Sequence, residues 1–258
     1  FFYEFIPYTE ETLRPAVRAR PIVFVAKNQL IEGFIACNMD WGFRIDMFCV
    51  KPGPNRSNIE DMLISKVEEE AKGRKVFVWL SSDSRIADFE KRGYEIYGGF
   101  YHLVRSLYNV PPVPSLAEGV TLRGMARGEE EAITRIFYDP EHVGTDIFKP
   151  GFTKVWKEDW SYIAELNGKI IAIVCTRPDD KFNAHFNAKR AEIWGPIGAR
   201  GILQELYKRA LMCYALSRLR EKGMEVVTVW DVEWPPEPTN FRISLGFRVK
   251  NHWKFLRK

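Results

Sequence analysis

The stretch YIAELNGKIIAIV, at residues 162–174, decides the fold, because it is typical of a strand, a tight Asn-Gly turn and a second strand. A similar stretch, VFVAKNQLIEGFIA, occupies residues 23–36. Further along, FEKRGY at 89–94 is echoed by RISLGF at 242–247, and an aromatic-rich terminal segment follows each copy. A repeat of this length predicts two similar domains in tandem, so any site must be sought twice.

The same order of elements is expected after each hairpin. A strand at residues 43–50 precedes a helix at 57–72, and a strand at 189–194 precedes a long helix at 202–222. A short apolar strand follows each helix, and a helix crossover makes it parallel to the strand before it. The pattern predicts an α/β fold (an α+β mixed sheet) with two tandem domains, each a mixed central sheet flanked by helices. The other expected elements are helices at 9–18, 84–92, 129–137 and 239–244 and strands at 76–80, 94–106, 120–123, 225–232 and 247–255.

A proline-rich stretch, VPPVP at residues 110–114, divides the two copies. Proline fixes φ and removes an amide donor, so this segment is stiff and unsuited to the interior of a sheet. We therefore expect an N-terminal domain at residues 1–108, a linker at 109–118 and a C-terminal domain at 119–258.

The composition of the 258-residue chain bounds its class. With 46% apolar residues it can form sizeable cores, and no apolar run approaches the roughly 18–20 residues of a membrane span. We expect no membrane partner and no secretory leader, although the sequence starts at Phe1. The net charge of +4 suits a phosphate-bearing ligand and makes a nucleic-acid partner unlikely. High Glu, Lys and Arg with two glutamines resembles a thermophile composition.

Cysteine and histidine usage bears on compartment and metals. Cys37, Cys49, Cys175 and Cys213 lie within apolar patterns without CxxC spacing, which predicts buried free thiols and a reducing cytoplasm. The four histidines do not stand at ligand spacing, so we expect no metal site.

In both halves a strand leads into a polar, Gly-rich or Pro-rich turn and then into the N-terminus of a helix. Free backbone N–H groups and the positive end of the helix dipole meet at such a point. This arrangement predicts a site for a pyrophosphate group.

The order of elements resembles the GCN5-related N-acetyltransferase (GNAT) family, in a two-domain arrangement similar to mycothiol-synthase-like tandem proteins. In that family a loop of pattern Arg/Gln-x-x-Gly-x-Gly/Ala follows a strand and holds the acetyl-CoA pyrophosphate, and a Tyr stands a few residues before a Gly-Phe. The resemblance covers most of residues 22–108 and 119–258 by element order, and only fragments of them by motif. It implies an N-acetyltransferase that uses acetyl-CoA as acyl donor.

On this resemblance the second half keeps the better phosphate loop. Its middle glycine is Gly201, while Gly198 replaces the leading Arg or Gln, and Arg200 can still reach a phosphate. Backbone N–H groups near Trp194 and Gly195 would polarise the acyl carbonyl. The residues expected at acetyl-CoA are Trp194, Gly195, Gly198, Ala199, Arg200, Gly201, Ile202 and Arg242.

The first half departs further from the family pattern. Its loop falls on residues 55–60, where both glycines are absent, and Glu60 and Asp61 would cap the helix where pyrophosphate should sit. The first domain is therefore expected to be degenerate. The family Tyr falls on Phe89 in the first half and on Arg242 in the second, and arginine is a poor acid because its pKa exceeds about 12.

A general base is also required, since an ammonium substrate must lose a proton before its nitrogen attacks. By position the candidates are Glu192, on the strand before the loop, and Asp231 and Glu233, at the end of the strand after the helix. Each of them can instead be a solvated or paired carboxylate.

Two functions from different classes remain open. The first is an acyl-CoA-dependent N-acetyltransferase that moves an acetyl group to a primary amine by direct attack. The alternative is a catalytically degenerate GNAT-fold protein that binds or regulates, which the loss of Tyr in both halves favours. The amine acceptor, whether a small molecule or a protein, is not named by the variable stretches at 139–160 and 177–187, and a homodimer is possible.

Overall fold

The computed structural model describes residues 10–39, 42–81, 83–129, 158–198, 202–233 and 236–258. By contact the chain forms two compact units. The first is made of Phe1–Tyr101, Val232–Pro235 and Asn251–Lys258, and the second of His102–Asp231 and Pro236–Lys250.

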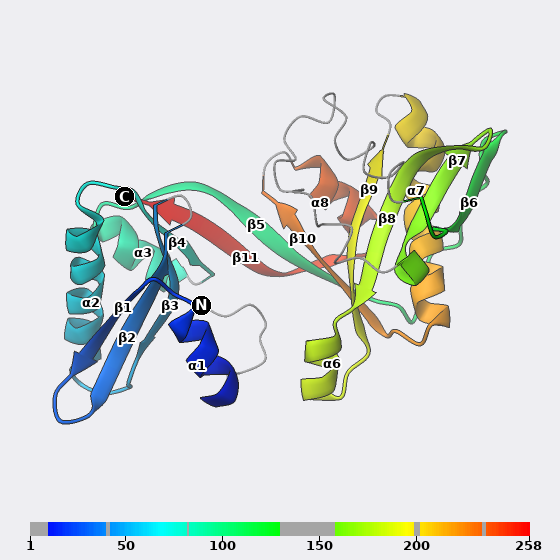
Figure 1. Cartoon of the computed structure of the whole chain (residues 1–258). Helices are drawn as coiled ribbons and strands as arrows, with labels where there is room; N and C mark the ends of the chain where they lie inside the picture. Colours follow the sequence, from blue (N-terminus) through cyan, green and yellow to red (C-terminus); the bar gives the residue numbers. More distant parts are fainter. Residues whose placement is uncertain (1–9, 40–41, 82, 130–157, 199–201, 234–235) are drawn as a thin grey trace. The chain divides into compact units, whose positions relative to one another are not determined.

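The first unit contains an antiparallel three-stranded meander, then a helix, a strand, a second helix and a long strand (Figure 1). Its strands run in the order β1-β2-β3-β4-β11-β5, in which β4 is parallel to β3 and antiparallel to β11. The elements are α1 (Glu10–Arg18), β1 (Ile22–Lys27), β2 (Ile31–Asn38), β3 (Phe43–Val50), α2 (Arg56–Ala71), β4 (Val76–Leu80), α3 (Asp83–Lys91) and β5 (Glu95–Ser106).

The helix α2 packs on this sheet through the apolar residues that its sequence spacing predicts. Ile59, Leu63, Ile64 and Val67 are buried in one core together with residues of β2, β3 and β4. The N–H of Lys72, a left-handed residue, bonds to the carbonyl of Glu69, and this ends the helix before Gly73. The helical crossover from β3 to β4 is therefore formed as expected.

The second unit follows a similar order, with four antiparallel strands and the helix α6 before its crossover helix. Its strands run β5-β10-β9-β8-β7-β6, with β9 and β10 parallel and the pairs from β9 to β6 antiparallel. The predicted mixed α/β fold in two tandem copies is thus confirmed. The elements are β6 (Val120–Gly124), η2 (Glu158–Trp160), β7 (Tyr162–Leu166), β8 (Lys169–Pro178), α6 (Asp180–Phe186), β9 (Arg190–Gly198), α7 (Ile202–Glu221), β10 (Val226–Val232) and α8 (Glu237–Ser244). The last strand, β11 (Arg248–Arg257), begins in this unit and belongs to the first unit from Asn251 onward.

One helix of the second unit was missed, and one expected helix is not described. α6 lies within 177–187, which the sequence presented as a variable stretch, and Asp179 caps it by accepting a hydrogen bond from the N–H of Phe182. The expected helix at 129–137 falls almost wholly outside the described residues. Seven residues are too few for a periodic pattern to show, so only the cap could have marked α6.

The units exchange a segment that the proline-rich linker does not reveal. The sequence pattern assigned residues 247–255 to the close of the C-terminal domain, whereas contacts place Asn251–Lys258 with the first unit. There Lys254–Arg257 pair with β4, and the fully buried Leu256 joins the core beneath α2. An apolar strand pattern does not indicate which strand it pairs with, so this pairing depends on the tertiary structure.

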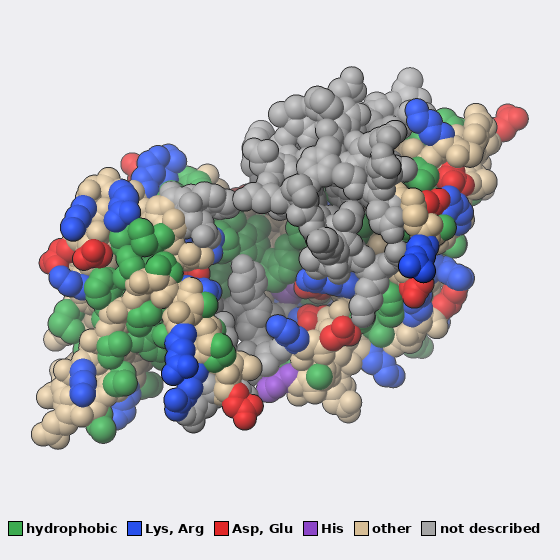
Figure 2. All heavy atoms as spheres, viewed as in Figure 1, with side chains coloured by type: hydrophobic (Ala, Val, Ile, Leu, Met, Phe, Trp, Pro, Cys, Tyr) green, Lys and Arg blue, Asp and Glu red, His purple; other side chains and the backbone are tan. Residues whose placement is uncertain are grey.

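Three of the four cysteines are buried as free thiols, as predicted, and for the fourth the prediction of burial is wrong. Cys37, Cys175 and Cys213 are buried, but Cys49 is exposed near the end of β3, where the alternation of burial along that strand breaks. Over β1 and β2 some apolar side chains are also exposed among polar ones (Figure 2), of which Ile31 is 64% and Val25 49% exposed. An apolar strand pattern thus overstated burial in this outer part of the sheet.

Leu256→Ala should destabilise the first unit although the residue follows the whole second unit in sequence. Removing a fully buried leucine side chain costs about 2–5 kcal/mol of unfolding free energy, and the cavity would lie in the core of α2 and β4. Hydrogen exchange should speed up in α2 and β4 while β8 keeps its protection. Val249→Ala, on an exposed side chain of the same strand, is the matched control. Loss of protection in β8 with α2 unchanged would contradict the assignment.

Candidate functional site

The strands β9 and β10 pair over only a short part of their length. The ladder joins Arg190–Glu192 to Val226–Thr228, whereas β9 continues to Gly198 and β10 to Val232. The two strands diverge beyond the ladder (Figure 1). Backbone N–H and C=O groups of both strands therefore face partners other than each other at the end of β9 that leads to α7.

Two glycines on the diverging part of β9 lie against β8. Gly195 has φ +98°, and a Cβ there would stand 2.7 Å from the carbonyl oxygen of Ile173. At Gly198 a Cβ would overlap the carbonyl oxygen of Ile171. Trp194 lies opposite Cys175 and is partly buried against the apolar cluster that Cys175 forms with Ile163 and Ile173. The predicted residues Trp194, Gly195 and Gly198 are thus held on one strand by close backbone packing.

A buried ion pair spans the diverging strands. The Nη1 of Arg242, on α8, lies 2.7 Å from Oδ1 of Asp231 on β10, and its Nη2 donates to the carbonyl oxygen of Gly195 at 2.8 Å. The side chains of Arg242 and Asp231 are only 7% and 5% exposed. Burial raises the pKa of Asp231, and the adjacent guanidinium opposes that shift. The structure therefore brings together Asp231, Arg242 and Gly195 from the predicted set.

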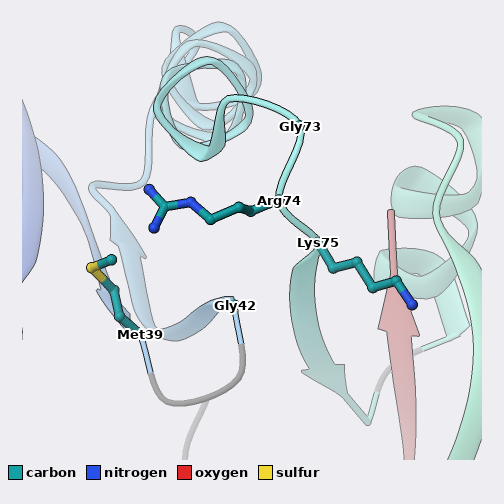
Figure 3. A pocket seen from close by; sticks show the side chains of 5 residues that line it. All are labelled: Met39, Gly42, Gly73, Arg74 and Lys75. Carbon is teal, nitrogen blue, oxygen red and sulfur yellow. The ribbon is translucent and has the colours of Figure 1, made fainter.

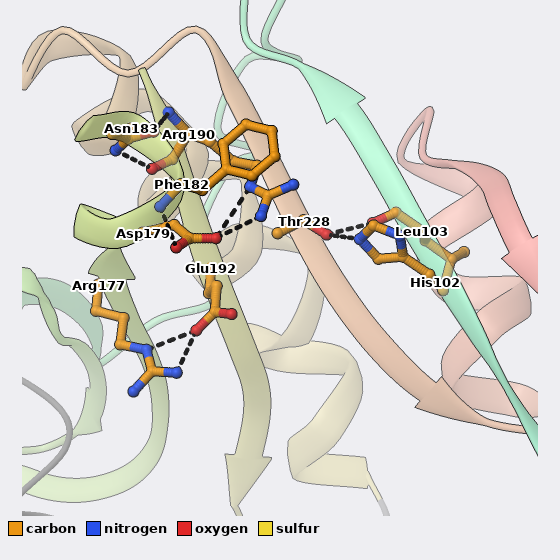
Figure 4. A network of polar contacts seen from close by, with 9 residues as sticks. All are labelled: His102, Leu103, Arg177, Asp179, Phe182, Asn183, Arg190, Glu192 and Thr228. Atoms are coloured by element: carbon orange, nitrogen blue, oxygen red, sulfur yellow. Dashed lines mark hydrogen bonds and ion pairs between the residues drawn. The ribbon is translucent and has the colours of Figure 1, made fainter. Parts of the chain in front are cut away.

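Glu192 lies elsewhere on β9, in a polar network with β8 and α6 (Figure 4). Its Oε2 accepts a hydrogen bond from Nε of Arg177, the residue directly opposite on β8, at 2.5 Å. Nearby, Arg190 pairs with Asp179 at 2.5 Å and lies 3.3 Å above the ring of Phe182. The contacts of Arg190 attach α6 to β9. The hydrogen bond from Arg177 holds the Glu192 carboxylate against β8.

Glu233 belongs to the first unit, not the second. Its N–H donates to the carbonyl of Gly99, and its carboxylate lies 2.5 Å from Nζ of Lys254 and 3.4 Å from Nε2 of His252. The ring of His252 stacks on Tyr101 at a centroid distance of 4.3 Å. Burial, and next the charge of Lys254, lower the pKa of His252, while Glu233 opposes them. Glu233 therefore sits among basic neighbours of its own unit.

No protein-family model and no curated protein sequence matches the chain. Solved structures do match it. A GCN5-related N-acetyltransferase from Sphaerobacter thermophilus superposes with a TM-score of 0.65 at 17% identity, covering 91% of this chain and 78% of that one. A tandem GNAT protein from the clavulanic acid biosynthesis pathway gives 0.59 at 16% identity, covering 93% and 84%.

The chain has the GNAT fold. A third structure, the glucosamine N-acetyltransferase region of a fungal multi-domain β-N-acetylglucosaminidase, agrees with a TM-score of 0.68 at 14% identity, covering 98% of this chain and 35% of that one. The resemblance drawn from the sequence is thereby confirmed for the fold, while the likeness to mycothiol-synthase-like proteins stays a prediction.

The loop that the sequence predicts as a phosphate site joins β9 to α7. Ala199, Arg200 and Gly201 lie outside the described residues, between the end of β9 at Gly198 and the start of α7 at Ile202. The strand-to-helix order that the sequence predicted around this loop is present. α7 is 20 residues long, so its N-terminus carries a full helix dipole.

In the first unit, an acidic side chain and two arginines lie together near the start of the corresponding helix, α2. α2 begins at Arg56 with no acidic residue in its first turn, so the expectation that Glu60 and Asp61 cap it is wrong. Glu60 lies one turn further in, where it accepts hydrogen bonds from Arg56 and Arg85. Burial alone raises the pKa of Glu60, but these two hydrogen bonds bring it below its ordinary value. The basic groups here already have an anionic partner.

Neither GNAT Tyr position carries a proton donor. Phe89 is 1% exposed and packs edge-on against Tyr94, with ring centroids 4.9 Å apart. Arg242 is engaged on both sides, as described above. Each residue has become part of the core of its unit.

The contacts of two further residues were not predicted from the sequence. Arg177 becomes visible only when the register of β8 on β9 is known, because that register places it opposite Glu192. His102 is 1% exposed on β5, bonds through Nε2 to the Thr228 hydroxyl and stacks on Trp230 at 4.0 Å. Nothing in the local sequence signals this contact, since the partners are 126 residues apart.

A separate surface hollow lies in the first unit (Figure 3). Met39, Gly42, Gly73, Arg74 and Lys75 line it, and the guanidinium of Arg74 lies 4.6 Å above the ring of Phe43. None of the predicted site residues borders it. Within the described part of the chain, no group of three or more metal-ligating side chains gathers, and no helix is long and apolar enough to cross a membrane.

The imidazole of His252 should titrate below its ordinary value of 6.5. Since the folded-state pKa is the lower one, protonation favours unfolding, and the residue's contribution to stability is lost as the pH falls below 6.5. Proton NMR of the ring should show the midpoint rising in Lys254→Met, which removes a repelling charge, and falling in Glu233→Gln. Opposite shifts in these two variants would contradict the described cluster.

Proposed function

We propose that the second unit binds acetyl-CoA and that the protein transfers its acetyl group to a primary amine. The observation that carries the proposal is the parallel pair β9 and β10, which separates next to the N-terminus of α7. The GNAT fold supports it, since the matched structures include a GCN5-related N-acetyltransferase and a glucosamine N-acetyltransferase region.

The pyrophosphate would lie at the loop before α7. Free N–H groups of a helix N-terminus and the dipole of a long helix favour a phosphate there. Gly198, Ala199, Arg200, Gly201 and Ile202 would surround it, with Arg200 as a charged partner. Trp194 and Gly195 would border the acyl end, on a strand that Gly195 and Gly198 allow to lie close against the backbone of β8.

The reaction would proceed by direct attack. The neutral amine nitrogen forms a bond to the thioester carbonyl carbon, the carbon–sulfur bond breaks, and CoA leaves as the thiolate, which takes up the proton that the attacking nitrogen then loses. The ammonium proton of the substrate must pass to a base beforehand. Among Glu192, Asp231 and Glu233, the contacts favour Glu192. Both Glu192 and Asp231 are paired with an arginine, but the Glu192 side chain is 20% exposed and that of Asp231 only 5%, while Glu233 lies in the other unit.

The first unit would serve as a scaffold without a ligand of this kind. Glu60 already balances Arg56 and Arg85 at its helix start, and Phe89 cannot transfer a proton. Basic and acidic side chains are mixed over the described part of the face in Figure 2, in keeping with a net charge of only +4. We therefore keep nucleic acid as an unlikely partner and a homodimer as an open one.

A second candidate is a GNAT-fold protein that binds acyl-CoA or another partner without turnover. The observation that favours it is Arg242, which falls on the family Tyr position and is bound through its two terminal nitrogens to Asp231 and Gly195. Binding without product in an amine panel would select this alternative.

Calorimetric titration with acetyl-CoA tests the proposed site. We expect one site per chain, and Gly201→Glu should abolish binding because its carboxylate repels the pyrophosphate. The matched control is Gly53→Glu, in the loop before α2, where a Cβ meets nothing within 4 Å. Two sites per chain, or unchanged binding in Gly201→Glu, would contradict the proposal.

Kinetics with an accepted amine test the base. Glu192→Gln should lower kcat by about 10²–10⁴-fold and leave acetyl-CoA affinity unchanged, because the amide cannot take a proton. The loss should shrink as the pH rises and the free amine becomes abundant. A Glu192→Gln enzyme with normal kcat would transfer the role to another group.

A further inference from the structure

The divergence of β9 and β10 poses a mechanical problem. Their ladder ends at Glu192 and Thr228, so strand hydrogen bonds do not fix the distance between the strands further along. A ligand that lies along this part of β9 needs its backbone groups at fixed positions. Something other than the sheet must therefore hold the two strands apart at one width.

Arg242 reaches both strands from a third element. From α8 it bonds to the Asp231 carboxylate on β10 at 2.7 Å and to the Gly195 carbonyl on β9 at 2.8 Å. Its Nη1 also lies 3.4 Å from the carbonyl of Pro238, at the start of α8. One buried guanidinium thus ties β9, β10 and α8 together.

A bulge in β9 supplies the carbonyl that Arg242 binds. Ile173 pairs with Ile197 and Cys175 with Trp194, so β9 has one more residue than β8 across this interval. The extra length falls at Gly195 and the following proline, which has no N–H to donate. The Gly195 carbonyl is thereby turned to Arg242 instead of a strand partner.

We infer that Arg242 is a positioning residue that, with Asp231 and the Gly195 carbonyl, fixes the separation of β9 and β10 where acyl-CoA binds. This inference rests on the proposed function. It assigns Asp231 and Arg242 to each other, so neither exchanges a proton with the substrate. The planar fork of arginine points donors in two fixed directions, whereas a lysine ammonium is a single point charge and cannot span both strands.

Arg242→Lys tests this inference, because it keeps the charge that Asp231 needs and removes the bridge. We expect a folded protein whose acetyl-CoA affinity is about tenfold or more weaker. Hydrogen exchange at Ile193 and Ile197 should accelerate, while Val227, inside the β9–β10 ladder, keeps its protection. Arg220→Lys, at an exposed position of α7, is the matched control and should change neither quantity.

If Arg242→Lys binds acetyl-CoA like the unaltered protein and exchanges at the same rates, the inference is overturned. Should lysine prevent folding, the double substitution Asp231→Leu with Arg242→Met decides the same question, because it removes both buried charges together. Its folded form should show the same loss of affinity and the same local exchange, and wild-type values in it would also overturn the inference.

The two proposals fail in different ways. If the unaltered protein binds no acetyl-CoA, the proposed function is lost. The inference about Arg242 then stands when the exchange of Ile193 and Ile197 accelerates in Arg242→Lys, and it falls when that exchange is unchanged.

Discussion

The close approach of two backbones constrains the candidate site. At Gly195 and Gly198 the strand β9 lies so near β8 that a single added carbon meets a carbonyl oxygen. The bulge of β9 lies at the same place, and the Gly195 carbonyl there accepts a hydrogen bond from Arg242. The buried pair with Asp231 joins β10 to the same point. The close packing of β9 on β8, the bulge and the buried ion pair of the second unit thus meet at Gly195.

The two units share a fold but differ in the residues at corresponding positions. Each has a helix crossover between parallel strands, from β3 to β4 and from β9 to β10. In the first, Glu60 neutralises two arginines beside the crossover helix, and Phe89 is part of the core. In the second, the loop before α7 keeps Gly201, and an arginine stands where the first has Phe89. The order of elements is thus duplicated, whereas the residues at these corresponding positions are not.

The fold could be predicted because its signals are local. The Asn-Gly hairpin, the spacing of Ile59, Leu63 and Val67, and the repeated element order each depend on residues close in sequence. The site was only partly predictable. The sequence named Asp231 and Glu192 as candidate bases and Arg242 as a residue at acetyl-CoA. It did not reveal their partners, because no local pattern shows that Arg177 lies opposite Glu192 or that Arg242 binds Asp231. Such pairings depend on tertiary structure.

The exchanged strand has a consequence for synthesis. Asn251–Lys258 leave the ribosome after every residue of the second unit, yet Leu256 completes the core formed by β2, β3, β4 and α2. An N-terminal domain usually folds while the rest of the chain is still being made. The first unit cannot complete its core in this way. Its first hundred residues must wait with an open sheet edge beside β4 until translation has passed the second unit, and in that interval they are the part most exposed to mispairing with other chains.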